Sequence, residues 1–97
     1  MKISELYSGM KTVSVQAKVL EISKPREVAS RFGGRINRVA TAVISDESGK
    51  INLALWNQQI ESVAVNDTIQ VENGYVTEFR GVKQLNVGRY GTLRVIK

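Results

Sequence analysis

The sequence predicts a small all-β protein that closes into a barrel. Two observations carry this prediction: apolar and polar residues alternate along several short segments, and turn-forming residues separate those segments. The clearest case is residues 44–56, where Asp46-Glu-Ser-Gly49 forms a tight turn and the apolar residues then fall on Ile51, Leu53 and Leu55. The chain has 97 residues, so we expect residues 1–97 to form one domain with a small core.

The first strand is predicted to bend. Its apolar residues alternate from Val13 to Val19, and the apolar phase then slips to Leu20. Such a slip predicts a β-bulge, which lets one strand serve two sheets or close a barrel. Residues 1–10, which precede this strand, fit either a short helical turn or an extended lead-in.

A basic loop and a hairpin follow the first strand. Residues 23–35 contain the only proline and the pair Gly33-Gly34, which predicts a mobile loop with Phe32 near its tip. The second and third strands are predicted over residues 36–45 and 50–57, on either side of the tight turn.

The remaining elements are predicted to be a connector, a fourth strand, a second loop with aromatic and basic residues, and a fifth strand that two glycines interrupt. They cover residues 58–67, 68–77, 77–83 and 83–95. Gly74 is a weak residue inside a strand, so it marks a bulge or the close approach of another backbone. Such a bulge turns Tyr75 away from the core, whereas without it Tyr75 is a core residue.

Together these elements indicate a five-stranded Greek-key barrel, the OB-fold. An SH3-like barrel of similar size is the alternative. The loops after the first and fourth strands favour the OB-fold, because there they flank the face of the second and third strands, where nucleic acid binds.

The composition favours a binding module over an enzyme. The chain has no cysteine and no histidine, which removes thiolate nucleophiles and the commonest metal ligand and general base. We therefore expect no catalysis, no cofactor and no metal. Asp46 and Glu47 are adjacent carboxylates, but in a tight turn Asp46 is better explained as an acceptor for backbone N–H groups.

The charge distribution favours a polyanionic partner. The net charge is +5, and basic residues concentrate in segments 24–38 and 80–97, whereas segment 39–79 is acidic. Separated charges in a small domain are expected of a nucleic-acid binder, while charges that only solvate loops are interspersed. No segment approaches the roughly 20 apolar residues of a membrane helix, so an intracellular, cytoplasmic or nucleoid-associated protein is expected.

Trp56, the only tryptophan, carries the most functional information. It falls on the outward face of the third strand, with Asn52 and Ala54. An exposed aromatic on a rigid strand is how sequence-tolerant single-strand binders stack bases, and a covering loop is the alternative explanation. Phe79 in the second loop is a further stacking candidate, and Phe32 is either a clamp that orders on binding or a plug at the barrel end.

Basic side chains around these aromatics are candidates for phosphate contacts, because each contact releases counterions from the nucleic acid. The candidates on the two sides of the groove are Arg26, Arg35 and Arg38, and Arg80, Lys83 and Arg89.

Two motifs give the sequence a family resemblance. They are Asp46-Glu-Ser-Gly49 followed by Leu55-Trp56, and Glu72-Asn-Gly-Tyr75 followed by Phe79-Arg-Gly81. From about residue 5 to about residue 95 the chain resembles the simple archaeal single-stranded DNA-binding proteins and their relatives in the eukaryotic sensor of single-stranded DNA complex. The resemblance implies that Trp56, Tyr75 and Phe79 stack on successive bases. Longer relatives recruit partners through a flexible tail, and the sequence up to Lys97 contains no such segment.

We therefore expect a non-enzymatic protein that coats single-stranded DNA in replication, recombination and repair, largely without sequence preference. Replication or repair proteins are further expected partners. Two alternatives remain: an interaction subunit of a replication protein A-like assembly, in which Trp56 is buried against another chain, and a binder of single-stranded RNA.

Overall fold

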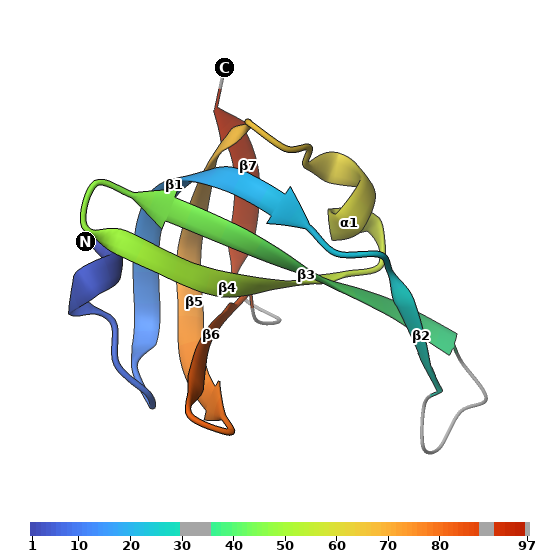
Figure 1. Cartoon of the computed structure of the whole chain (residues 1–97), viewed down its shortest axis with the longest axis horizontal. Coiled ribbons are helices and arrows are strands. Elements are labelled where there is room, and N and C mark those ends of the chain that lie inside the picture. Colours follow the sequence, from blue (N-terminus) through green and yellow to red (C-terminus); the bar gives the residue numbers. More distant parts are fainter. Residues whose placement is uncertain (30–35, 88–90, 97) are drawn as a thin grey trace.

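A computed structural model describes residues 1–29, 36–87 and 91–96, apart from the side chain of Phe79. In this part the chain forms seven strands, one short α-helix and one 3-10 turn (Figure 1). In chain order these are η1 (Ile3–Glu5), β1 (Lys11–Ile22), β2 (Arg26–Ala29), β3 (Ile36–Asp46), β4 (Gly49–Trp56), α1 (Gln58–Ser62), β5 (Thr68–Phe79), β6 (Val82–Asn86) and β7 (Thr92–Ile96).

Five of the strands close into a barrel. The order is β1-β3-β4-β6-β5, and β5 pairs with β1 to complete the ring. The β4–β6 pair is parallel and the other pairs are antiparallel. The predicted five-stranded OB-fold is thereby confirmed, since five strands with this order and one parallel closure make the Greek-key barrel.

The predicted bend in the first strand is present. The register between β1 and β3 shifts between Val19 and Glu21, where the apolar phase of the sequence slips. The first part of β1, from Lys11 to Lys18, pairs with β5, and the part from Lys18 to Ile22 pairs with β3, so β1 belongs to both sides of the barrel.

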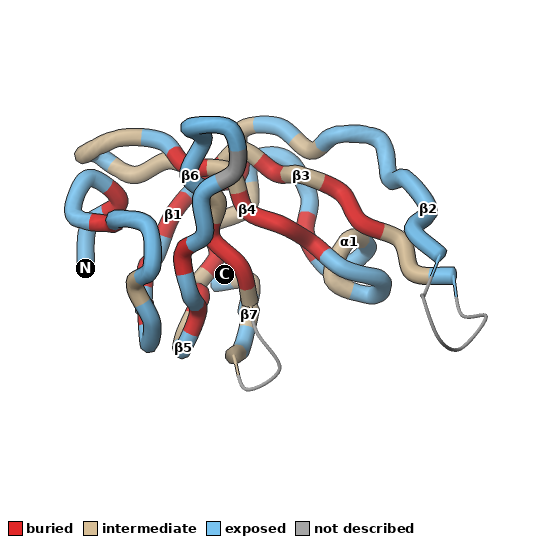
Figure 2. Tube along the Cα trace, turned by 90° about the horizontal axis from the view of Figure 1, so that it is seen from below, coloured by how far each residue is buried: buried red, intermediate tan, exposed pale blue. Residues whose placement is uncertain are grey.

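One predicted segment differs from the structure, and a predicted interruption is present. The loop predicted over residues 23–35 contains β2, a four-residue strand that pairs with β3 and is exposed along its whole length (Figure 2). The interruption predicted in the fifth strand is present, since the structure describes this strand as β6 and β7, which pair with different parts of β5. The division faces Asn73 and Gly74, because β6 ends opposite Tyr75 and β7 begins opposite Glu72. The β5 bulge interrupts the ladder there.

The core fills the barrel with the inward residues of these strands, and buried residues recur along the central strands in Figure 2. On β4 the inward side chains are Ile51, Leu53 and Leu55, of which Leu53 and Leu55 are fully buried. The N-terminal 3-10 turn adds Ile3 and Leu6 to the same core. None of the described helices is long and apolar enough to cross a membrane.

The β3–β4 turn fastens this N-terminal segment to the barrel. The Asp46 carboxylate accepts hydrogen bonds from the backbone N–H groups of Ile3 (2.8 Å), Ser48 (2.7 Å) and Gly49 (3.1 Å), and from the Ser48 hydroxyl. These bonds, the Ser48 hydroxyl first, lower the pKa of Asp46 to about 2. The predicted role of Asp46 as an acceptor for backbone N–H groups is confirmed.

Candidate nucleic-acid interface

The exposed aromatics lie on one side of the curved sheet, which we call the outer face. The cross-strand register defines it, because alternate residues of paired strands share a face. Its members are Val39, Thr41 and Val43 of β3, Lys50, Asn52, Ala54 and Trp56 of β4, Gln84 and Asn86 of β6, and Tyr75 and Thr77 of β5.

Trp56 is the last residue of β4 and the one aromatic residue of that strand. Its side chain is 40% exposed, and it pairs across the ladder with Val39, which is buried. Its backbone N–H donates to the Gln59 side chain (3.0 Å), so the first turn of α1 holds the strand end in place. The indole is therefore presented on a fixed backbone with much of its surface open.

Tyr75 faces outward because of its neighbour Gly74. A Cβ at Gly74 would lie 2.8 Å from the Asn86 carbonyl oxygen, so only glycine lets the two backbones approach this closely. The β1–β5 register shifts beside Gly74, and Tyr75 is 40% exposed. The predicted bulge and the outward position of Tyr75 are confirmed.

Hydrogen-bonded amides form the floor between the two aromatics. Asn86 is 8% exposed, and its Nδ2 donates to Thr77 Oγ1 (3.0 Å) and the Gln84 carbonyl oxygen (3.2 Å). Gln84 Nε2 in turn donates to Asn86 Oδ1 (3.1 Å). A satisfied amide network of this kind fixes its side chains, so the floor keeps its shape.

The two exposed aromatics are separated across the sheet. Ala54, Asn86 and Tyr75 lie in one row across β4, β6 and β5, and Trp56 lies two residues beyond Ala54. With standard strand spacing and rise, the Cα atoms of Trp56 and Tyr75 are therefore roughly 12 Å apart. Both residues are 40% exposed.

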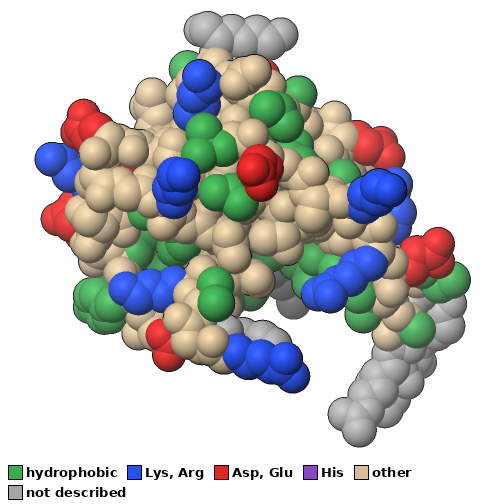
Figure 3. Space-filling model, in the orientation of Figure 1, with side chains coloured by type: hydrophobic (Ala, Val, Ile, Leu, Met, Phe, Trp, Pro, Cys, Tyr) green, Lys and Arg blue, Asp and Glu red, His purple; other side chains and the backbone are tan. Residues whose placement is uncertain are grey.

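Two of the predicted basic residues border this face. Arg26 of β2 pairs with Val39, which pairs with Trp56, so the three residues form one cross-strand row. Arg80 is exposed in the two-residue turn between β5 and β6, where Arg80 and Gly81 both have positive φ. Figure 3 shows the surface hollowed between the arm that carries β2 and the β5–β6 turn, with basic side chains on both rims.

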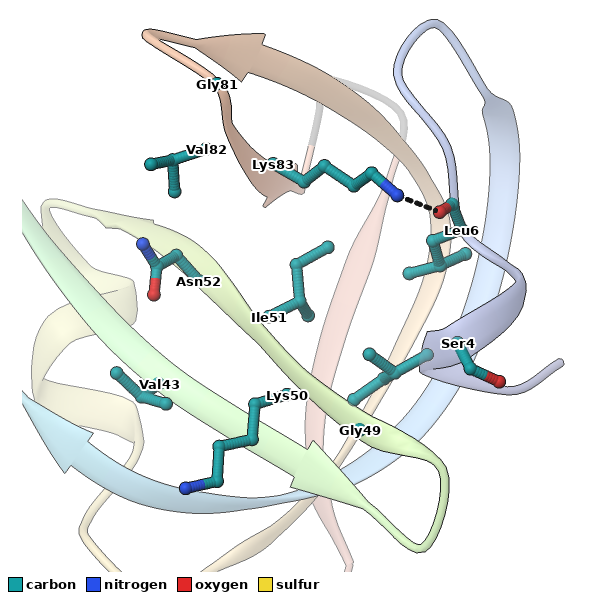
Figure 4. A pocket seen from close by; sticks show the side chains of 11 residues that line it. Ser4, Leu6, Val43, Gly49, Lys50, Ile51, Asn52, Gly81, Val82 and Lys83 are labelled. Carbon is teal, nitrogen blue, oxygen red and sulfur yellow. Dashed lines mark hydrogen bonds between the residues drawn. The ribbon is translucent and has the colours of Figure 1, made fainter.

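Two other predicted basic residues have contacts within the protein. Arg38 alternates with Val39, and its Nη2 forms an ion pair of 2.7 Å with Glu61 of α1. Lys83 alternates with Gln84, and its Nζ donates to the Leu6 carbonyl oxygen at 3.1 Å (Figure 4). Both cations thus serve contacts within the protein. The candidates Phe32, Arg35 and Arg89 lie outside the described residues, and of Phe79 only the backbone is described, at the end of β5.

Three polar residues of this region were not among the predicted site residues. Lys11 at the start of β1 pairs with Tyr75, and Lys50 and Asn52 share the outer face of β4 with Trp56. The alternation that singled out Trp56 also selects Asn52 and Lys50. Lys11 had no such signal, because its pairing with Tyr75 depends on the closure of the barrel. In the described part of the chain, no three carboxylates gather as a metal would require.

Comparison with known proteins gives a family for this arrangement. A model of the family described as "Single-stranded DNA binding protein Ssb-like, OB fold" matches residues 6–95. The single-stranded DNA binding protein Ssb of Saccharolobus solfataricus is 32% identical over 90% of the chain, and replication factor A of Methanothermobacter thermautotrophicus is 30% identical over 99%. The chain spans 57% of the first relative and 12% of the second.

Solved structures agree. The replication factor A related protein from Methanobacterium thermoautotrophicum matches with a TM-score of 0.81 and 27% identity, over 99% of this chain and 89% of that one. The second OB-fold domain of replication protein A from Methanococcus maripaludis also gives 0.81, over 100% of this chain and 94% of that one. Its 23% identity supports the fold alone.

Proposed function

The chain belongs to the Ssb-like family of single-stranded DNA binding proteins with an OB fold, and from this premise we propose that it binds single-stranded DNA without catalysing a reaction. The observation that carries the proposal is the pair of exposed aromatics, Trp56 and Tyr75, on one face of the barrel. The names of the relatives, a single-stranded DNA binding protein and a replication factor, support the same function.

The mechanism is base stacking over a rigid floor. Each base offers a flat π-face whatever its identity, so an aromatic binds it with about 1–3 kcal/mol and little sequence preference. Trp56 and Tyr75 each take one base, and Phe79 takes a third at the end of β5. The amide network of Asn86 ties β6 to β5, the strand that carries Tyr75.

Phosphate contacts hold the strand across these rings. Arg26 lies in the row that ends at Trp56, and Arg80 is exposed at the β5–β6 turn. An arginine also stacks on bases, which a lysine ammonium does not do. We assign Arg35 and Arg89 the same role from their places in the two basic segments, and Phe32 that of a clamp. Phosphate contacts carry no base information, so the complex suits a protein that coats exposed strands in replication, recombination and repair.

A fluorescence titration tests the proposal, because Trp56 is the only tryptophan and its emission reports on this face alone. Single-stranded DNA is expected to quench the emission in a saturable way, and duplex of the same length is expected to bind much more weakly at physiological salt. Stacking needs splayed bases, which a paired helix does not offer. Equal affinity for both would show that the aromatics are not the binding platform.

The same titration separates the alternatives. A protein-interaction module that buries Trp56 against another chain predicts no response to any oligonucleotide. Single-stranded RNA is expected to bind with similar affinity, because stacking and phosphate contacts do not distinguish ribose from deoxyribose. A large preference for RNA would point to contacts with the 2′-hydroxyl group and would change the proposed substrate.

A further inference from the structure

We propose that the single-strand site continues past the aromatics into a nucleotide subsite at the other end of β4, with Asn52 as the base contact and Lys50 as the phosphate contact. The inference rests on the proposed function and extends it. It adds a position for a base that is held by hydrogen bonds and a charge instead of an aromatic ring.

The subsite is an open hollow of about 600 Å³ between β4, β6 and the N-terminal turn (Figure 4). This volume is within the range of small-molecule sites. Val43, Lys50 and Asn52 line it on one side and Val82 on the other, and Asn52 and Val82 stand on facing walls. The aliphatic side chains offer an apolar surface to the faces of a base, and Asn52 offers a donor and an acceptor to its edge.

The hollow is continuous with the aromatic face. Lys50, Asn52 and Trp56 are on the same side of β4, and six residues of a strand cover roughly 20 Å. Asn52 pairs with Gln84, whose amide belongs to the floor between the two rings. A single-stranded nucleic acid that runs from Trp56 along the outer face of β4 therefore reaches the hollow.

The polar groups in the hollow are available for a ligand. Among the described residues, no hydrogen bond or ion pair engages the Lys50 ammonium or the Asn52 amide, and Lys50 is exposed. Lys83, by contrast, is held by the Leu6 carbonyl oxygen. An unpaired ammonium at the end of a basic groove attracts a phosphate.

The position of Glu21 indicates the path of the nucleic-acid strand through the hollow. Glu21 of β1 pairs with Val43, which lines the hollow, so an exposed acidic residue lies next to that lining residue on the β1 side. Repulsion between this carboxylate and a phosphodiester turns the strand toward the β6 side, where Gln84 and Val82 lie.

The test compares Lys50→Gln, Asn52→Ala and the double variant with the wild-type chain on oligothymidylates from about three to about ten nucleotides, the range of OB-fold site sizes. Both residues are on the outer face, so the variants are expected to keep the fold, and circular dichroism melting checks this. Arg94→Gln is the matched charge control, since Arg94 pairs with Glu72 on the β5–β7 ladder. Gln16→Ala is the matched amide control, on an exposed position of β1.

Lys50→Gln is expected to reduce the slope of log K against log salt by about 0.7, or roughly fivefold in affinity at 0.1 M salt. Asn52→Ala is expected to lose roughly two- to tenfold, the range for one hydrogen bond. Both losses are expected only with oligonucleotides long enough to pass the aromatics, and the controls are expected to match the wild type.

Equal losses on the shortest oligonucleotides, or no loss on the longest ones, would overturn the subsite. Retained quenching of Trp56 in those experiments would leave the proposed function standing. Absence of quenching in the wild-type chain would instead refute the function itself, so the two failures are distinguishable.

Discussion

The two faces of β4 have opposite environments although their residues alternate along one strand. Leu53 and Leu55 are fully buried in the core, whereas Trp56 is 40% exposed and Lys50 lies on the surface. The alternation of a strand makes this division possible within eight residues. The inner face therefore supports stability and the outer face is free to bind, so substitutions on the two faces are expected to affect different measurements.

The division is not simply one of buried against exposed. Ala54 is on the outer face but only 2% exposed, and its neighbour Asn86 is buried and fully hydrogen-bonded. The outer face therefore combines buried, packed residues with open aromatic and charged groups, and Tyr75 lies in the same cross-strand row as Ala54 and Asn86.

The largest expected effect comes from the inner face. Leu53→Ala removes a fully buried side chain and leaves a cavity, so we expect a loss of about 2–5 kcal/mol in the free energy of unfolding. Urea denaturation measures this loss. Binding by the fraction that remains folded is expected to be unchanged. A loss below about 0.5 kcal/mol, the range of surface substitutions, would contradict the assignment of Leu53 to the core.

The corresponding change on the outer face is Trp56→Ala. It is expected to weaken binding to a labelled pyrimidine oligonucleotide by about 1–3 kcal/mol, measured by anisotropy, because one stacking contact is lost. The melting temperature is expected to stay close to that of the wild type. Trp56→Phe is the control, since it keeps an aromatic ring. A drop in stability as large as that of Leu53→Ala would show that Trp56 supports the core instead.

The sequence predicted most of this division, because its signals are local. The alternation from Ile51 to Trp56 gave both faces of β4, the phase slip at Leu20 gave the bulge in β1, and Gly74 gave the outward turn of Tyr75. Each of these depends on neighbouring residues along one strand, for which the period of two is sufficient evidence.

Features that depend on contacts between distant segments were not predicted. The ion pair between Arg38 and Glu61 needs α1 to pack beside β3, and the bond from Lys83 to Leu6 needs the N-terminal turn to reach β6. The pairing of Lys11 with Tyr75 likewise needs the closure of the barrel. A list of basic residues in the sequence does not show which of them already have partners in the fold.

A pair of arginine substitutions sharpens this point. Arg26→Gln is expected to reduce the salt slope by about 0.7, since Arg26 lies in the row of Trp56. Arg38→Gln is expected to leave the slope almost unchanged and to cost at most about 1 kcal/mol of stability, because it breaks an exposed ion pair. Titrations at several salt concentrations distinguish the two. Equal slopes for both variants would show that strand alternation does not decide which cations meet the DNA.

The smallest effect is expected at the turn end of β4, where Asp46 holds the N-terminal segment. Its pKa is about 2 in the folded protein, below the ordinary value of 3.8, so the folded state favours the carboxylate. Its contribution to stability is complete above pH 4 or so and is lost as the pH falls through about 2. Melting temperatures between these pH values measure the loss.

Asp46→Asn is expected to flatten this part of the profile of stability against pH, because the amide does not titrate. Solvent near the turn screens the effect, so we expect it to be smaller than those of Leu53→Ala and Trp56→Ala. Above pH 5, the quenching of Trp56 by the shortest oligonucleotides is expected to be unaffected in Asp46→Asn, because this turn and Trp56 lie at opposite ends of β4. An unchanged acid profile in the variant would mean that other carboxylates cause the acid sensitivity of the fold.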